Sequence, residues 1–305
     1  MPAVIPAIGA AFSAVSTFAA SSALAGFLVN TVSSIALSAL ATAIRGKPDL
    51  QQPGISTETT TAGGTVPQRL ILGSYCTAGQ MVAPMMVYQT DNDPNEWLVY
   101  VISLPDKPVT GLGRIIVNGR YHTIDGNPAA SQHGDGMGAT TLDLVNSDWD
   151  GLRNDIFIRF HDGNQTTPDA YLRRVFGDYP ERPWTADMIG YGVAYVVVTF
   201  KGKAGTEDYS GLPSIKFEVD GHPLYDPRDA TQNPANEATW KFTRNPAVIA
   251  YNILRGINMP GGDRWGVGAT SFVLSSVIAA MNVCAEQVPT ETGANRARYI
   301  AGLEV

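Results

Sequence analysis

Short apolar segments, separated by glycine, proline and other turn residues, fill the chain between residues 69 and 229. In the segment Ile156–Phe160 the apolar side chains recur at alternate positions, which is the period of a β-strand with a buried face. The dipeptide Asn118-Gly119 is a pair favoured in two-residue hairpin turns. Only one short helix is expected here, near Asp169–Phe176. This pattern predicts a fold that is mainly β.

The apolar period becomes helical near the C-terminal end. Asn245 precedes Pro246, which is the pattern of a helix N-cap followed by proline at the first helical position. A second helix is expected to begin at Thr270 or Ser271 as its N-cap. Its apolar side consists of Phe272, Val273, Val277, Ile278 and Met281. The last residues, ARYIAGLEV, resemble a strand without a closing turn, so we expect the polypeptide to continue beyond Val305. The predicted fold class is α+β, mainly β.

The first 44 residues contain no charged side chain, and the first charge is Arg45. Bulky residues are spaced by three or four positions, as at Ile5, Ile8, Phe12 and Val15. This spacing predicts an apolar helical segment over residues 1–45.

Four interpretations of this segment remain open. A transmembrane span is long enough, although serine and threonine dilute its apolar character. A secretory signal has an A-x-A match at Ala23–Ala25 but lacks a basic start. An unstructured apolar tail is unfavourable in water. We favour a helix or helical hairpin buried against copies of itself or a partner, because small residues let helices approach closely.

Composition limits the classes of partner and cofactor. Charged residues make up 16% of the 305 residues, and the formal net charge is −7. Phosphate neutralisation needs clustered lysine and arginine, so specific nucleic-acid binding is not expected. A chain of this length more often forms two domains than one. We assign residues 1–45 to the apolar segment, 46–68 to a linker or extended arm, 69–205 to β-rich domains, possibly one inserted in another, and 206–305 to a hairpin plus two helices.

The stretch GLPSIKFEVDGHPLYDPRD, residues 211–229, concentrates four acids and a histidine. It is either a metal or acid–base site, or a strand followed by a turn. Lys216, Glu218 and Asp220 alternate with apolar residues, which is typical of a half-buried strand with a charged outer face. The alternation therefore favours a structural role for this stretch over a metal or acid–base site.

The residues that follow support the same interpretation. Asp220-Gly221 is a hairpin-turn dipeptide, so we expect Asp220 and His222 to lie in a surface turn. Asp226-Pro227 is expected to end the return strand, because proline cannot continue a ladder.

One further stretch partly resembles a calcium loop. Asn146, Asp148, Asp150 and Gly151 occupy its first, third, fifth and sixth positions. The twelfth position, where a bidentate glutamate is required, is Phe157. We therefore expect no calcium site here.

Other motifs for catalysis or metal binding are missing from the sequence. The histidines do not have the spacing of metal ligands; they are His122, His133, His161 and His222. Cys76 and Cys284 form no C-x-x-C pattern, so neither zinc nor a disulfide framework is indicated. We expect no catalytic, cofactor-binding or metal site, and no cofactor.

Five blocks resemble, in order, the N-terminal region of the central tail hub proteins of long-tailed bacteriophages. This family includes the lambda-like tail-tip attachment proteins and relatives in gene transfer agents. The blocks are GTVPQRLILGSYCTAGQMV, WLVYVISLPDKPVTGLGRIIVNG, GLPSIKFEVDGHPLYDPRD, TWKFTRNPAVIAYNILRG, and NVCAEQV followed by RYIAG. Together they cover most of residues 64–305. The apolar N-terminus and the stretch 121–188 match less clearly.

The resemblance implies a structural virion protein without enzymatic activity. It implies a homotrimer at the tail tip that closes the tail tube, with β-barrel or sandwich domains similar to tail-tube subunits. The expected partners are a distal tail ring protein, the tape-measure protein and receptor-binding proteins, and DNA would pass through the lumen during ejection. From the residues alone, we also expect residues 1–44 to gather on the trimer axis, because three copies can bury one another's apolar stripes. Since the segment carries no charge, it could contact the host membrane on ejection. Assembly would take place in the bacterial cytoplasm.

Two other functions stay open from the sequence. Tail tips carry cell-wall or surface-polymer hydrolases, which would require a close pair of carboxylates or a nucleophile–base pair in a cleft. The hypothesis of a membrane-anchored surface protein rests only on the apolar residues 1–44.

Overall fold

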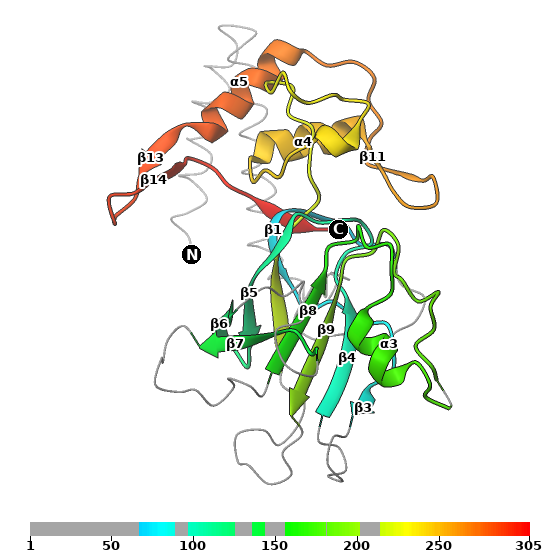
Figure 1. Ribbon diagram of the computed structural model, residues 1–305. Coiled ribbons are helices and arrows are strands. Elements are labelled where there is room, and N and C mark those ends of the chain that lie inside the picture. Colours follow the sequence, from blue (N-terminus) through cyan, green and yellow to red (C-terminus); the bar gives the residue numbers. More distant parts are fainter. Residues whose placement is uncertain (1–66, 89–96, 126–135, 144–155, 181, 202–213) are drawn as a thin grey trace, which may run out of the picture. The chain divides into compact units, whose positions relative to one another are not determined.

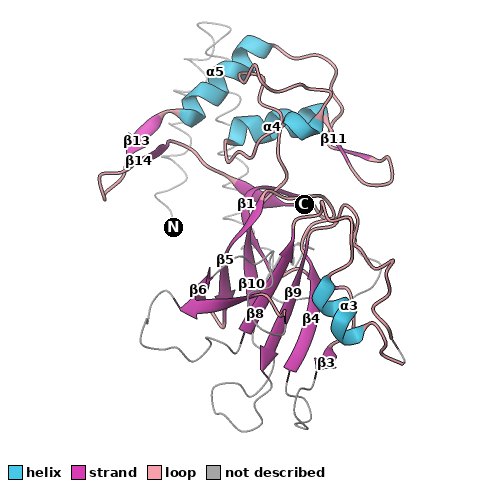
Figure 2. Ribbon diagram, viewed as in Figure 1, coloured by secondary structure: helices cyan, strands magenta, loops and turns pink. Residues whose placement is uncertain are grey.

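The computed structural model describes residues 67–88, 97–125, 136–143, 156–180, 182–201 and 214–305 (Figure 1). All of them belong to one compact unit that begins at Ile55. Strands dominate and helices are few, which confirms the mainly β class (Figure 2). The apolar segment 1–45, nearly all of the arm 46–68, His133 and residues 146–155 of the candidate calcium loop lie outside the described residues.

Eleven of the described strands form one antiparallel sheet. They are β1 Ile71–Thr77, β2 Gln80–Met81, β3 Met86–Tyr88, β4 Trp97–Ser103, β5 Gly111–Val117, β6 Arg120–Asp125, β7 Ala139–Asp143, β8 Ile156–His161, β9 Tyr195–Lys201, β10 Ile215–Asp220 and β15 Gly302–Glu304. Their order is β15-β1-β10-β5-β6-β7-β8-β9-β4-β2, with β3 also paired to β4. The resemblance implied a β-barrel or a sandwich; no ladder among the described strands joins the two ends of this path, so these strands do not close into a barrel.

One face of the sheet encloses a hydrophobic core. Side chains from β1, β5 and β10 belong to the same cluster as side chains from β4, β8 and β9. The sheet therefore curls until two halves of one face meet. The main contributors are Ile71, Ile115, Phe217, Ile102, Ile158 and Val198. In β10 the apolar side chains point into this core and the charged ones lie on the outer face, as the alternation predicted.

On the opposite face, α3, Ala170–Phe176, covers the part of the sheet that β4, β8 and β9 form (Figure 1). Leu172 and Phe176 of this helix pack in a second cluster with Val99 of β4 and Val197 of β9. Strand β9 is therefore buried on both faces, which explains its nearly continuous apolar sequence. The short helix expected near Asp169–Phe176 is confirmed.

Two helices near the C-terminal end, α4 Pro246–Arg255 and α5 Leu274–Ala285, are also confirmed. They surround a third cluster that includes Val248 and Met281. Two small antiparallel ladders accompany them. These are β11 Ile257–Asn258 with β12 Arg264–Trp265, and β13 Gln287–Pro289 with β14 Asn295–Ala297. None of the helices in the described part of the chain has the length and apolar character needed to span a bilayer.

Local turn and cap signals are only partly confirmed. Asn118 and Gly119 both have positive φ, 48° and 80°, and join β5 to β6 as the dipeptide predicted. Asn245 caps α4 by accepting from two backbone amides, also as predicted. The N-cap of α5 was predicted wrongly. The helix begins after Val273, without a side-chain cap, and Thr270 and Ser271 lie in the irregular chain before it.

The prediction of a hairpin turn at Asp220-Gly221 is also wrong. The chain does not turn back after β10 but continues beside β1, where the amides of Gly221 and His222 donate to the carbonyls of Gly73 and Ile71. A Cβ atom on Gly221 would collide with the Ile71 carbonyl. Glycine is required here for close backbone approach rather than for a turn.

This contact predicts the effect of a single methyl group. Gly221→Ala should lower the free energy of unfolding by about 2 kcal/mol or more, because backbone atoms must move to admit the side chain. Urea unfolding measures the change. Gly111→Ala in the neighbouring β5 is the matched control, since its Cβ would meet no atom within 4 Å. Equal losses for the two variants would contradict the steric explanation.

Candidate functional site

Two of the four carboxylates of the acid-rich stretch, Glu218 and Asp220, lie on the outer face of β10. Arg114 of β5 donates to both oxygens of Glu218, from Nε and Nη2, at 2.7 Å each. The Arg114 guanidinium also lies over the ring of Tyr121, 4.4 Å from its centre. The hydroxyl of Ser74 donates to Asp220. Each carboxylate is thus held as a hydrogen-bond acceptor by a neighbouring strand.

A hollow of about 650 Å³ adjoins these carboxylates. Its walls include Cys76, Thr123 and Arg244 in addition to Glu218 and Asp220. Burial raises the pKa of the Cys76 thiol, and the nearby Glu218 carboxylate raises it further. A raised pKa disfavours the thiolate, which is the nucleophilic form of cysteine. The hollow therefore brings two carboxylates together without an activated nucleophile.

His222 is buried, contrary to the prediction that it lies in a surface turn. Its Nδ1 donates to the carbonyl of Pro108 at 2.9 Å. Its Nε2 lies 3.5 Å from Glu237, which also accepts from Lys107 at 2.9 Å. Because the chain continues past Gly221 along β1, His222 is carried into this contact instead of to the surface.

Glu237 is the electrostatic centre of this cluster. The imidazole of His222 and the ammonium of Lys107 lower the pKa of Glu237 to about 2, against the opposing effect of burial. Lys107 also donates to the carbonyl of Asn258 at 2.7 Å. The cluster thus joins the turn after β4 to the segment before α4 and to β11.

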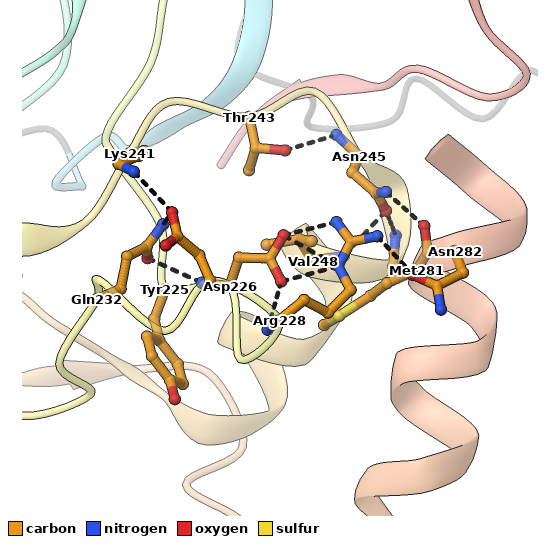
Figure 3. A network of polar contacts seen from close by, with 12 residues as sticks. Tyr225, Asp226, Arg228, Gln232, Lys241, Thr243, Asn245, Val248, Met281 and Asn282 are labelled. Carbon is orange, nitrogen blue, oxygen red and sulfur yellow. Dashed lines mark hydrogen bonds and ion pairs between the residues drawn. The ribbon is translucent and has the colours of Figure 1, made fainter. Parts of the chain in front are cut away.

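The Tyr-Asp-Pro-Arg part of the stretch forms a second network, at the helices (Figure 3). Arg228 donates to Asp226 from Nη2 at 2.6 Å and to Asn282 of α5 from Nη1 at 3.1 Å. Asn245, the cap of α4, also donates to the carbonyl of Met281 at 2.8 Å. Arg228 thus connects the segment after β10 to α5, the amide of Tyr225 connects it to Asn252 of α4 at 3.2 Å, and Asn245 joins α4 to α5. The Tyr-Asp-Pro-Arg motif, whose Asp226-Pro227 was predicted to end a strand, therefore connects to the two helices instead.

An aromatic cage completes this junction. The guanidinium of Arg255, at the end of α4, lies 4.7 Å from the ring centre of Tyr225, 5.7 Å from that of Trp240 and 5.6 Å from that of Tyr251. It also donates to the carbonyl of Pro234. Such cation–π contacts stabilise an arginine that has left bulk water. The cage is therefore already occupied by a residue of the chain itself.

A third polar cluster was missed at the level of sequence. Asp169 caps α3 by accepting from the Leu172 amide, and it accepts from Arg159 Nε at 2.7 Å. His161 Nε2 lies 2.7 Å from the same carboxylate, and the ring of His161 stacks on Tyr195 at 4.4 Å. Burial by itself would raise the pKa of Asp169, but these partners together lower it. The cluster contains a His–Asp pair, and the acid in it also serves as a helix cap.

The remaining candidates do not converge on a site. Within the described ranges, no group of three or more His, Cys, Asp or Glu side chains could hold a metal ion. Cys76 and Cys284 are both free thiols. His122 is buried in β6. A cap signal before α3 was readable from Asp169, but its partners could not be read because they lie on another strand.

Comparison with known proteins gives limited information. No protein-family model matches the chain, and no curated protein matches it. Among solved structures, a chain from the virion of a native gene transfer agent particle is similar, with a TM-score of 0.33 and 16% sequence identity. The match covers 83% of this chain and 51% of that chain, so this protein spans about half the length of its structural neighbour. A TM-score of this size does not define a common fold, so the proposal below rests on the residues.

The burial of His222 changes what its substitution should do. His222→Ala should lower the free energy of unfolding by about 1–3 kcal/mol, because the Pro108 carbonyl loses its donor in a buried place. Asp220→Asn should cost less than about 1 kcal/mol, since an amide oxygen can still accept from Ser74. Urea unfolding of both variants tests this order. A silent His222→Ala would mean that the imidazole contributes nothing to the junction.

Protonation of Glu237 should lower the free energy of unfolding at acidic pH. Its folded pKa of about 2 lies below its ordinary value of 4.5, so its stabilisation is complete above 4.5 and is lost as the pH falls toward 2. Wild type should lose about 1 kcal/mol more than Glu237→Gln between about pH 5 and pH 3, a modest amount because the carboxylate is partly exposed. Urea unfolding at both pH values measures this difference. Glu291→Gln, in the exposed turn after β13, is the control and should follow wild type.

Proposed function

We propose that this chain is a structural protein of a phage-type virion. In this proposal it forms the central hub at the tail tip and acts without catalysis. Three copies would close the end of the tail tube and connect the tube and tape-measure protein to the receptor-binding parts. The observation that carries the proposal is that the five family-like blocks form one continuous body.

The blocks meet although they are far apart in the chain. β1, β5 and β10 come from the first three blocks and are neighbours in the sheet. β15, which follows the RYIAG sequence, pairs with the other side of β1. The fourth block supplies α4, which packs on Leu70 and Leu72 beside and within β1. Segments that resemble one family in sequence thus build the central part of this molecule together.

The polar residues of these blocks also support a scaffold. Asp226, Arg228 and Asn245 connect segments to the helices. Glu218 and Asp220 are engaged by Arg114 and Ser74. A hydrolase would instead present an acid and a base, or a nucleophile and a base, toward a bound substrate. This arrangement favours a role in assembly over catalysis.

Two substitutions separate the assembly function from the hydrolase alternative. Ile249→Asp places a charge in the core beneath α4, where Ile249 is 2% exposed, and should abolish assembled tails. Asp220→Asn should leave both tail assembly and infectivity at wild-type levels. Electron microscopy and plaque or transduction counts measure the two effects. Intact tails that lose infectivity in Asp220→Asn would support an active site at the hollow instead.

A further inference from the structure

Exposed apolar side chains gather in the C-terminal part of the described chain. Seven of the large exposed hydrophobic residues lie between positions 254 and 300: Leu254, Val267, Val273, Leu274, Val283, Tyr299 and Ile300. In α5 only Met281 is fully buried. Figure 1 shows that α5 leads directly into the β13–β14 hairpin. Most of this helix is therefore uncovered.

The exposed side of α5 has no charge. The sequence contains no Asp, Glu, Lys or Arg between Arg264 and Glu286. A helix face that stays in water normally carries charged residues. Ser276 and Ala280, one turn apart, are exposed, and such small residues let another backbone approach closely. The face has the character of a contact surface.

Charges of both signs follow this apolar face, at the C-terminal end of α5. The hairpin region carries two acids and two arginines, all exposed: Glu286, Glu291, Arg296 and Arg298. In the described chain β13 and β14 pair only with each other, and a lone two-stranded ladder is marginally stable in water. An uncharged centre with a polar rim of both signs is the usual composition of a protein interface.

We propose that α5 and the β13–β14 hairpin form the contact between copies of this chain. The whole chain has a formal charge of −7, so two copies repel over most of their surfaces. Between residues 265 and 300 the two acids and two arginines cancel, so a second copy can approach this surface without net repulsion. A face adapted to a strongly charged partner would instead carry one sign in excess. The inference rests on the proposed function and names the surface through which the copies of the hub meet.

Helix α5 of one copy then packs against α5 of the next around a symmetry axis. Ser276 and Ala280 face the neighbouring helix. Glu286 and Arg298 already pair within one copy at 2.9 Å, so Glu291 and Arg296 are the charges left to pair across the contact. Around such an axis each group lies near the same group of the next copy. A charged residue on α5 would therefore be repelled by its own equivalent.

Substitution at the exposed Ala280 tests the proposal on the full chain. Wild type should be an oligomer at micromolar concentration by analytical ultracentrifugation, and Ala280→Glu should sediment as a single chain of 32.5 kDa. Circular dichroism should stay at its wild-type value, because the side chain lies at the surface, whereas the Tm should fall to the value of a dissociated wild type. Tyr191→Glu is the matched control; Tyr191 is 66% exposed, lies outside this face, and its substitution should leave the oligomer intact.

A cross-link gives an independent readout if Ala280→Glu disturbs folding. With Cys76 and Cys284 changed to serine, Ala280→Cys should form a disulfide-linked dimer on mild oxidation, whereas Tyr191→Cys should not. A monomeric wild type, an oligomer that survives Ala280→Glu, or a failed cross-link would each overturn the inference. So would a wild-type monomer that binds another purified tail protein through α5.

The two proposals can fail separately. Virions that contain several copies of the chain, joined through another surface, would overturn the α5 contact and leave the hub function standing. If the chain forms a solution oligomer that depends on Ala280 but is missing from purified virions, the α5 contact would stand and the hub function would be overturned.

Discussion

The fold depends on the two-sided packing of β1. Successive side chains of a strand point to opposite faces, so Ile71 enters the core inside the sheet while Leu70 and Leu72 enter the core beneath the helices. The same strand is held in register by β10 on one side and β15 on the other. One strand therefore belongs to both cores and makes the sheet and the helices parts of one structure.

A buried ion pair lies where these parts meet. Arg69 and Glu304 lie 3.7 Å apart, with side chains 7% and 1% exposed. Burial lowers the pKa of Arg69 and raises that of Glu304, so their attraction does not fully offset the loss of water. Arg69 also donates to Ser103, and its backbone exchanges hydrogen bonds with Asp106. The pair is best understood as defining how β15 joins the sheet rather than as a large source of stability.

Several local features could be predicted from short stretches of sequence. The alternation in β10, the Asn118-Gly119 turn, the Asn245-Pro246 start of α4 and the helix after Asp169 each depend on neighbouring residues. The burial of His222 could not be predicted in this way. It depends on Pro108, 114 positions away, and on a path beside β1 that resembles a hairpin turn in sequence. The N-cap signal at Thr270 and Ser271 was likewise not used, because the helix begins three residues further on.

The sequence by itself determined the mainly β class, the capped helix α4 and the alternation of buried and outward-facing residues in β10, because periodicity and capping act over a few residues. Only the tertiary structure decided that the ladders among the described strands leave the sheet open, that Glu237 gathers Lys107 and His222, and that Tyr225 and Arg228 connect to the two helices. It also decided which apolar helix stays uncovered, since α4 and α5 are both apolar in sequence and only α4 is buried deeply. These outcomes depend on contacts between distant segments, whose geometry is set by the packing of the whole chain.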